Sequence, residues 1–244
     1  MAASLNFGHR GFSGQFPENT LLAFQKAVDA GCDGIELDVH LARDGEVVII
    51  HDETVDRTTN GSGNVRDFTL EQLKDLDAYG SFPGKFSKNE IPTLREYFDL
   101  IRDTGIITNI ELKTGVYTYP GIEQQTLKLI EEFDMKNRII ISSFNHYSVL
   151  RMMRLAPEMQ YGFLEESRVI DMPLYAHSHG MDAVHPLFNV VDAPYMRQCC
   201  QLGLDVNCWT VNTREDIMQM ARLGVHGIIG NNPDICADVL RNMR

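Results

Sequence analysis

Short runs rich in β-forming residues alternate along this chain with segments that have the apolar period of amphipathic helices. This alternation is typical of a parallel sheet joined by crossover helices, so it restricts the chain to the α/β class. Runs with the length and composition of strands lie at residues 5–9, 34–39, 47–51, 108–113, 139–144, 160–164, 183–185, 205–211 and 227–229. Helical patterns lie at residues 20–30, 93–103, 121–133, 146–155, 193–202, 214–223 and 233–242, with Thr20 and Thr213 as expected N-caps.

One link between these runs is too short for a parallel connection. The second and third runs are separated by a segment containing Asp44-Gly45, a dipeptide typical of β-hairpins. Parallel neighbours need a crossover of a dozen or more residues, so the third run must return antiparallel. Eight strands remain, and they predict a (β/α)8 TIM barrel. A two-residue turn at Asp44-Gly45 would place His51 opposite Asp38.

The rhythm of strand and helix breaks after the hairpin. Residues 53–90 are mostly polar and contain one short helical pattern, at residues 69–76. A long irregular connection of this kind is commonly a functional loop or lid. We therefore expect a single barrel domain over residues 1–244, with a small insertion at 53–90 that covers the mouth of the barrel.

Charge and composition limit the possible partners and compartments. The chain has 22 basic and 34 acidic residues and a net charge of −12, which argues against a nucleic-acid partner, because a phosphate backbone requires a basic surface. No secretory signal and no apolar run of about 20 residues, the length of a membrane-spanning helix, is visible. The five cysteines lack metal-ligand spacing and are expected to be reduced, so we expect a cytoplasmic protein.

Carboxylates gather at the ends of two predicted strands. Alternate residues of a strand point to one face, so Glu36 projects beside Asp38, while Glu111 ends another strand. If these strands are neighbours, three carboxylates crowd into one pocket and repel one another unless a cation joins them. An all-oxygen cluster suits a hard divalent ion such as Mg²⁺ or Ca²⁺.

Basic side chains stand at the same strand ends. Arg10 follows His9 at the end of the first strand, His51 ends the hairpin, and Lys113 follows Glu111 by two residues. Beside a divalent ion, such a set of cations and histidines has the chemistry needed to act on a phosphate ester.

A series of short motifs runs in order from the first strand to the last. Each piece is weakly specific by itself, but the ordered set is highly specific, and with it the chain resembles the glycerophosphodiester phosphodiesterase family. The motifs are His9-Arg10-Gly11, Pro17-Glu18-Asn19-Thr20, Ala23-Phe24, Ala27, Gly31, Asp33, Glu36, Asp38, Asp44-Gly45, His51-Asp52, Arg57-Thr58-Thr59, Ile91-Pro92-Thr93-Leu94, Glu111-Leu112-Lys113, Ser143-Phe144, Trp209-Thr210-Val211-Asn212 and Pro233.

The resemblance implies a TIM-type barrel with a small insertion after the hairpin. It also implies an enzyme that hydrolyses glycerophosphodiesters to glycerol 3-phosphate and an alcohol. One departure concerns the eighth strand, because the family commonly has Thr-Asp before the late proline, whereas this chain has Gly230-Asn231-Asn232 before Pro233.

The resemblance also implies a role for each strand-end residue. One divalent cation, Mg²⁺ or Ca²⁺, would be held by Glu36, Asp38 and Glu111. His9 and His51 would be the acid and base, in an order that the sequence leaves open, and Arg10 and Lys113 would bind the phosphate.

Several other residues have two readings. Trp209 has the parity to point into the barrel, where it either lines the alcohol pocket or packs in the core. His185 ends a strand and is a candidate for contact with the substrate, and His40 is expected at the rim at most. The remaining histidines are expected at the surface: His146, His177, His179 and His226.

The main alternative is a lysophospholipase D or a sphingomyelinase D, which use a similar catalytic set. Such an enzyme needs an apolar mouth or a membrane anchor, whereas the 53–90 insertion is mostly polar. A non-enzymatic phosphate-binding barrel is less favoured because no catalytic group is missing. An unrelated metal-dependent barrel enzyme, such as an aldolase, would more often be built around a Schiff-base lysine.

Overall fold

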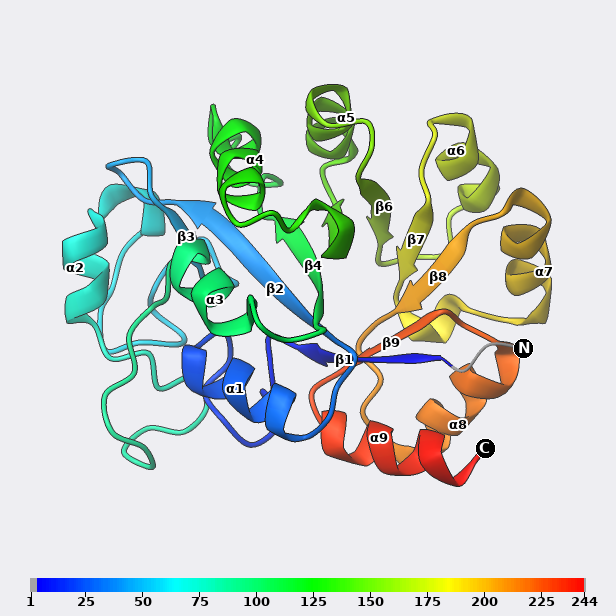
Figure 1. Ribbon diagram of the computed structural model, residues 1–244, viewed down its shortest axis with the longest axis horizontal. Coiled ribbons are helices and arrows are strands. Elements are labelled where there is room, and N and C mark those ends of the chain that lie inside the picture. The colour runs from blue at the N-terminus through cyan, green and yellow to red at the C-terminus, as the bar shows by residue number, and fades with distance from the viewer. Residues whose placement is uncertain (1–3, 244) are drawn as a thin grey trace.

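Eight parallel strands close into a barrel, with helices around its outside (Figure 1). The computed structural model describes residues 4–243. Along the sheet the order is β1-β9-β8-β7-β6-β5-β4-β2, and the pairing of β1 with β2 closes the ring. The predicted TIM barrel is confirmed. Its strands are β1 (Leu5–His9), β2 (Gly34–Leu41), β4 (Ile107–Leu112), β5 (Ile139–Ser143), β6 (Gln160–Glu165), β7 (Ala183–Pro186), β8 (Asp205–Cys208) and β9 (Gly227–Gly230).

A further strand, β3 (Val47–Ile49), lies outside the ring and pairs antiparallel with β2, which confirms the predicted return strand. The predicted register is wrong by one residue. The hairpin loop is residues 43–45, and it ends at Gly45, whose φ of +87° favours glycine. The loop thus has one residue more than a two-residue turn. The backbone N–H of Ile50, rather than that of His51, therefore donates to the carbonyl of Asp38, at 3.1 Å.

The crossover helices lie close to their predicted positions. The side chains of Thr20 and Thr213 accept hydrogen bonds from the backbone N–H groups of Ala23 and Asp216, so both predicted N-caps are confirmed. The helices are α1 (Leu21–Asp29), α2 (Leu70–Asp75), α3 (Leu94–Ile101), α4 (Ile122–Glu132), α5 (His146–Leu155), α6 (Met172–Ser178), α7 (Ala193–Leu202), α8 (Arg214–Leu223) and α9 (Pro233–Asn242).

The sequence predicts no helix between β6 and β7, but α6 lies there. This helix is short, and its N-cap residue Asp171 has a φ of +54° and forms no side-chain cap. A single buried turn such as that of Met172 and Ala176 gives little periodic signal. Packing against α7 and β7 therefore determines this helix more than its local sequence does.

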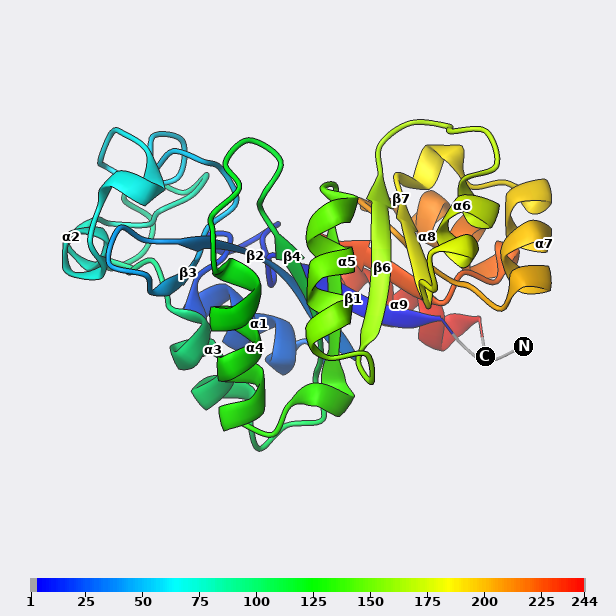
Figure 2. The ribbon, with the colours of Figure 1, turned by 90° about the horizontal axis from the view of Figure 1, so that it is seen from above.

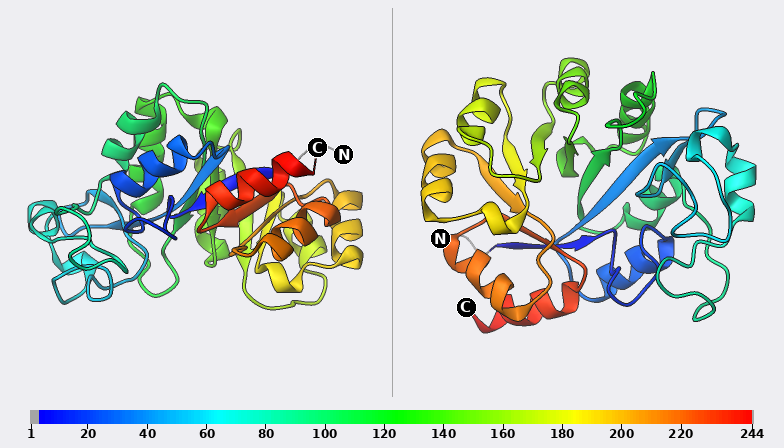
Figure 3. Two further views of the ribbon diagram at one scale, coloured as in Figure 1. Left: turned by 90° about the horizontal axis from the view of Figure 1, so that it is seen from below. Right: turned by 180° about the vertical axis from the view of Figure 1, so that it is seen from behind.

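The main apolar core lies between the strands and the helices, where residues such as Leu37 and Ile110 are fully buried. Inside the ring a much smaller cluster contains Phe7, Ile140 and Ile229. The last helix, α9, packs beside β1, so the two ends of the described chain complete one wall of the barrel (Figure 3).

The segment between β3 and α3 stands to one side of the barrel, next to β3 (Figure 2). It contains η1 (Val65–Asp67) and α2, and it has an apolar cluster of its own. Val55 and Leu73 of this segment pack with Val48 and Ile50 of the hairpin. The hairpin therefore links the segment to the strand that carries two of the predicted metal ligands.

Candidate active site

A cavity of about 360 Å³ opens at the carboxyl ends of the parallel strands, within the range of small-molecule sites. The residues of its walls come from strands on all sides of the ring, so residues far apart in the sequence lie around one cavity. Every predicted site residue except Asp38 is in the lining, which consists of His9, Arg10, Glu36, His51, Asn109, Glu111, Lys113, Phe144, Leu164, Glu166, Trp209 and Ile229.

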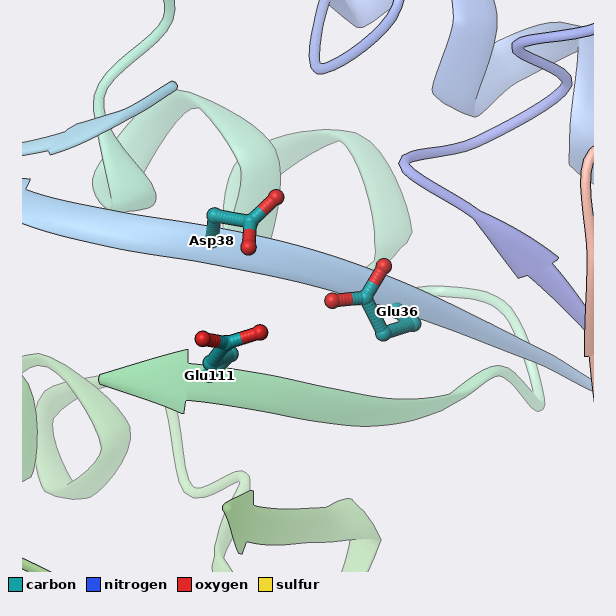
Figure 4. A group of neighbouring side chains, drawn as sticks. All are labelled: Glu36, Asp38 and Glu111. Atoms are coloured by element: carbon teal, nitrogen blue, oxygen red, sulfur yellow. The ribbon is translucent and has the colours of Figure 1, made fainter. Parts of the chain in front are cut away.

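Three buried carboxylates meet at one wall of this cavity. Glu36 and Asp38 extend from β2 and Glu111 from β4, and the three groups turn toward one another (Figure 4). The register pairs Asp38 with Glu111 across the two strands. One oxygen from each residue lies within 4.8 Å of the others, and Asp38 Oδ1 has no hydrogen-bond partner. The predicted clustering of these residues is therefore observed.

The charges of this cluster favour a bound cation. Burial and the neighbouring Asp38 raise the pKa of Glu36 well above its usual value, and burial also raises the pKa of Glu111. Burial alone would raise the pKa of Asp38 too, but His51 and Arg10 hold it below its ordinary value. Three converging carboxylates with an unpartnered buried oxygen fit a hard divalent ion, which removes the repulsion between them.

The two predicted phosphate-binding cations border the carboxylates. Arg10 Nη1 donates to Glu18 Oε1 at 2.8 Å, and its Nε lies 3.5 Å from Asp38 Oδ2. Lys113 Nζ lies 3.0 Å from Glu111 Oε1 and 3.9 Å from Asp38 Oδ1. Both cations are thus held beside the carboxylates while they line the cavity.

His9 is oriented by a residue of the last strand-to-helix loop. Its Nδ1 lies 2.7 Å from the side-chain oxygen of Asn231, and its Nε2 lies 3.9 Å from Glu36 Oε2. Because an amide oxygen only accepts, Nδ1 carries the hydrogen and Nε2 presents its lone pair. Burial and the positive charge of Arg10 lower the pKa of His9 to about 4, so the neutral ring is favoured.

His51 is oriented by a carboxylate. Its Nδ1 lies 2.6 Å from Asp52 Oδ1, and its Nε2 lies 3.3 Å from Lys113 Nζ. Arg57 Nε donates to Asp52 at 2.7 Å, and its guanidinium also donates to Glu18 at 2.8 Å. The hydrogen bonds from His51 and Arg57 hold the pKa of Asp52 well below its usual range, so this partner is charged.

The family model described as "Glycerophosphoryl diester phosphodiesterase family" matches residues 9–235. The chain belongs to this family. The prediction of the family, and with it of a phosphodiesterase enzyme, is confirmed.

Relatives cover the whole length of the chain. A glycerophosphodiester phosphodiesterase of Caldanaerobacter subterraneus is 44% identical over 238 residues, 98% of each chain. A solved putative glycerophosphoryl diester phosphodiesterase of Silicibacter pomeroyi has a TM-score of 0.92 at 26% identity, and covers 100% of this chain and 95% of that one. A phosphodiesterase of Oleispira antarctica, solved in complex with the product sn-glycerol-3-phosphate, has a TM-score of 0.91 at 27% identity, with 98% and 97% coverage. Within residues 4–243, no helix is both long enough and apolar enough to cross a bilayer.

In the present chain, Trp209 lines the cavity on the side opposite the carboxylates. The ring of Phe144 lies edge-on to it, with 5.6 Å between ring centroids and 88° between ring planes. The indole N–H donates to the carbonyl of His185 at 2.8 Å, which fixes the indole. Of the two predicted readings, the pocket-lining one matches this position, but a role in substrate binding stays a prediction.

Three other histidines differ from their predicted settings. His40 is fully buried rather than at the rim, because Tyr119 covers it and bonds to its Nδ1 at 3.0 Å. His185, named as a candidate for contact with the substrate, is also fully buried, bonds to Asn207 at 3.3 Å and does not line the cavity. His146 is half-buried, since its ring stacks on Phe163 with 3.9 Å between centroids.

Sequence reasoning assigned no role to four residues that shape this site. Asp52 and Arg57 were visible within family motifs but without a function, and Asn231 was visible only as a departure from the usual Thr-Asp. Glu166 gave one usable signal, its position directly after a strand. Strand-end position marks such residues as candidates, but their partners depend on the closed ring.

Proposed function

We propose that this chain hydrolyses glycerophosphodiesters to glycerol 3-phosphate and an alcohol, by acid–base catalysis at His9 and His51 beside a bound divalent cation. The main observation behind the proposal is that two histidines line one cavity and that their Nδ1 atoms have different hydrogen-bond partners. His9 Nδ1 faces a neutral amide, whereas His51 Nδ1 faces a charged carboxylate. The product bound to the Oleispira antarctica phosphodiesterase supports the same substrate class.

Glu36, Asp38 and Glu111 would hold the cation, and the oxygen donor set fits either Mg²⁺ or Ca²⁺. When bound, such an ion polarises a phosphoryl oxygen and neutralises charge on the substrate. Its binding requires these carboxylates to be ionised, although burial raises the pKa values of Glu36 and Glu111. Cation binding is therefore coupled to loss of protons from the cluster.

The two histidines take different duties in this scheme. His9 removes the proton of the nucleophile at Nε2, because Asn231 keeps the hydrogen on Nδ1. His51 protonates the oxygen of the leaving alcohol at Nε2, while the carboxylate of Asp52 accepts a hydrogen bond from Nδ1 and orients the ring. The nucleophile is either water or the glycerol 2-hydroxyl, and the second route passes through a cyclic phosphate.

Arg10 and Lys113 stabilise the non-bridging oxygens of the phosphate as negative charge develops on them. Glu18 and Glu111 hold these cations in place at 2.8 and 3.0 Å, so little reorganisation is required. Arg57 binds Glu18 and Asp52, which connects the insertion to both the phosphate-binding and the acid sides of the site. The insertion would thus support the site from beside the barrel, because no residue of 53–90 lines the cavity.

The test is release of glycerol 3-phosphate from glycerophosphocholine, measured with Mg²⁺, with Ca²⁺ and with excess chelator. We expect turnover with at least one ion and loss of turnover in chelator. A matched control is His177→Ala, since His177 is exposed on α6 and does not line the cavity. Full turnover in chelator, or no release of glycerol 3-phosphate under any condition, contradicts the proposal.

A second candidate is a lysophospholipase D activity. The loop after β6 carries Val169 and Ile170, which are 51% and 89% exposed and follow Glu166, a residue of the cavity lining, in the same loop. Apolar side chains in that place could contact an acyl chain. Parallel incubation with lysophosphatidylcholine decides between the two, because preference for the lysolipid would favour this activity.

A further inference from the structure

The cavity has two chemically different sides. The carboxylates, histidines and phosphate-binding cations come from β1, β2, β4 and the end of the hairpin. Other strands of the ring contribute Phe144 after β5, Glu166 after β6 and Trp209 after β8. Each of these three residues directly follows the last residue of its strand. They therefore stand at the reactive edge of the barrel, and the acid–base chemistry leaves Phe144 and Glu166 unused.

The two aromatic residues form a fixed pair. Their rings meet edge to face with 5.6 Å between centroids, and the hydrogen bond from the indole N–H to the carbonyl of His185 locks Trp209. Phe144 is 41% exposed, so its ring is open to a ligand in the cavity. Aromatic faces attract cations, and indole is the strongest of them.

Glu166 adds a free negative charge to this side. Among residues 4–243 its carboxylate takes part in no ion pair within 4.0 Å. The nearest basic residue in the sequence, Arg168, is directed to Asp192 at 3.0 Å. The preceding Glu165 is buried and accepts a hydrogen bond from Tyr195, so it belongs to the core rather than to the cavity. Glu166 is thus an exposed carboxylate without an ion-pair partner, on the same side of the cavity as the two aromatic rings.

The charges across the cavity follow a definite order. Arg10 and Lys113 carry positive charge where the phosphate would bind, and Glu166 carries negative charge on the opposite side. A phosphate ester of an amino alcohol has the complementary order, with the anionic phosphate joined through two carbons to a cation. Two aromatic rings and a carboxylate match that cation both in charge and in polarity.

We propose that Phe144, Glu166 and Trp209 form a subsite for a positively charged leaving alcohol, either a primary ammonium or a quaternary ammonium. This inference rests on the proposed function and specifies its substrate class. The subsite attracts the cation by its charge more than by its shape. It therefore accepts choline and ethanolamine alike and disfavours an uncharged alcohol of the same size.

The experiment compares glycerophosphocholine with its uncharged isostere, in which a tert-butyl group replaces the trimethylammonium. For the wild-type chain we expect kcat/KM to be about tenfold higher with the cationic substrate. Glu166→Gln should lower that ratio about fivefold, and Phe144→Leu should lower it by a similar factor, since both lose attraction for the cation. Phe144→Tyr keeps an aromatic face and should retain the ratio.

The matched control is Asp103→Asn, which also removes one negative charge. Asp103 is exposed between α3 and β4, at the opposite end of the barrel, and should leave the ratio unchanged. Equal kcat/KM for the two substrates in the wild-type chain, or an unchanged ratio in Glu166→Gln, overturns the subsite while leaving the phosphodiesterase activity intact. No hydrolysis of either substrate overturns the proposed function itself, so the two failures are distinguishable.

Discussion

The side-chain oxygen of Asn231 lies 2.7 Å from Nδ1 of His9, although 222 residues separate them in the chain. The contact follows from the closure of the barrel, in which β1 pairs with β9 and the loop after β9 reaches the end of β1. It fixes the ring so that Nε2 faces the cavity. The departure from the family's usual Thr-Asp thus falls on the partner of a proposed catalytic base.

Asn231→Ala should lower kcat about 10- to 100-fold, because a mobile imidazole is seldom in the reactive orientation. Asn231→Asp keeps the acceptor and should retain much of the activity, but the added carboxylate favours imidazolium and raises the pKa of His9 from about 4. A base must be neutral, so the acid limb of the kcat/KM profile should move to higher pH. A pH profile that is identical for Asn231→Asp and the wild-type chain would argue against His9 as the base.

His9→Ala and His51→Ala should each lower kcat by roughly two to four orders of magnitude, the usual contribution of acid–base assistance. The melting temperature should change little, because both side chains line a cavity rather than the apolar core. Single-turnover rates and thermal melts of both variants, beside His177→Ala, provide the measurement. Near wild-type turnover in either variant would remove that histidine from the mechanism.

Divalent ions should raise the melting temperature of the wild-type chain, because binding to the folded state alone stabilises it and relieves the repulsion among the carboxylates. Glu111→Gln should remove most of this rise. Since burial raises the pKa values of Glu36 and Glu111, protons compete with the ion, and the affinity should increase as the pH increases. Melts at several ion concentrations and pH values test this, and an ion-induced rise that persists in Glu111→Gln contradicts the proposed ligand set.

Rates with glycerophosphocholine and glycerophosphoethanolamine should lie within about tenfold, which corresponds to about 1.4 kcal/mol of transition-state discrimination. Bis(p-nitrophenyl) phosphate should be a much poorer substrate, because it lacks the glycerol hydroxyls that help to orient the phosphorus. A comparison of the three substrates at one fixed ion concentration measures both effects. Faster cleavage of the nitrophenyl diester would show that the site does not recognise glycerol.

Arg57→Gln should lower kcat about tenfold or more, because Arg57 holds Asp52, which in turn holds His51. The loss of stability should stay below about 1 kcal/mol for each ion pair, since the Arg57 side chain is 45% exposed and solvent screens its charge. Arg154→Gln, on the exposed surface of α5, is the matched control. If Arg57→Gln unfolded the chain but its folded fraction kept full kcat, the arginine would be structural only.

Local sequence patterns determined much of the fold. The alternation of strands and helices, the N-caps at Thr20 and Thr213, and the hairpin at Asp44-Gly45 all depend on residues close together in the chain. The shared strand face of Glu36 and Asp38 also follows from local periodicity, because a strand alternates its faces. These features could be predicted because each is decided within one or two elements.

The register of the hairpin and the helix α6 could not be predicted in the same way. One additional loop residue changes the register of the hairpin. The backbone conformation of Gly45 decides the loop length, and the Asp44-Gly45 dipeptide alone does not specify that conformation. His40 shares the strand face of Glu36 and Asp38, yet it is buried because Tyr119, 79 residues further on, covers it. Burial of a given side chain depends on what the rest of the chain places above it.

By itself, the sequence determined the fold class, the ordered family motifs and the residues available for catalysis. Only the tertiary structure decided the partners of those residues: Asn231 for His9, and Arg57 for Asp52 and Glu18. It also decided that Phe144, Glu166 and Trp209 line the same cavity. The physical reason is that the residue types and the alternation of strand faces are local properties. Proximity across the ring arises only when eight strands close and bring their carboxyl ends together.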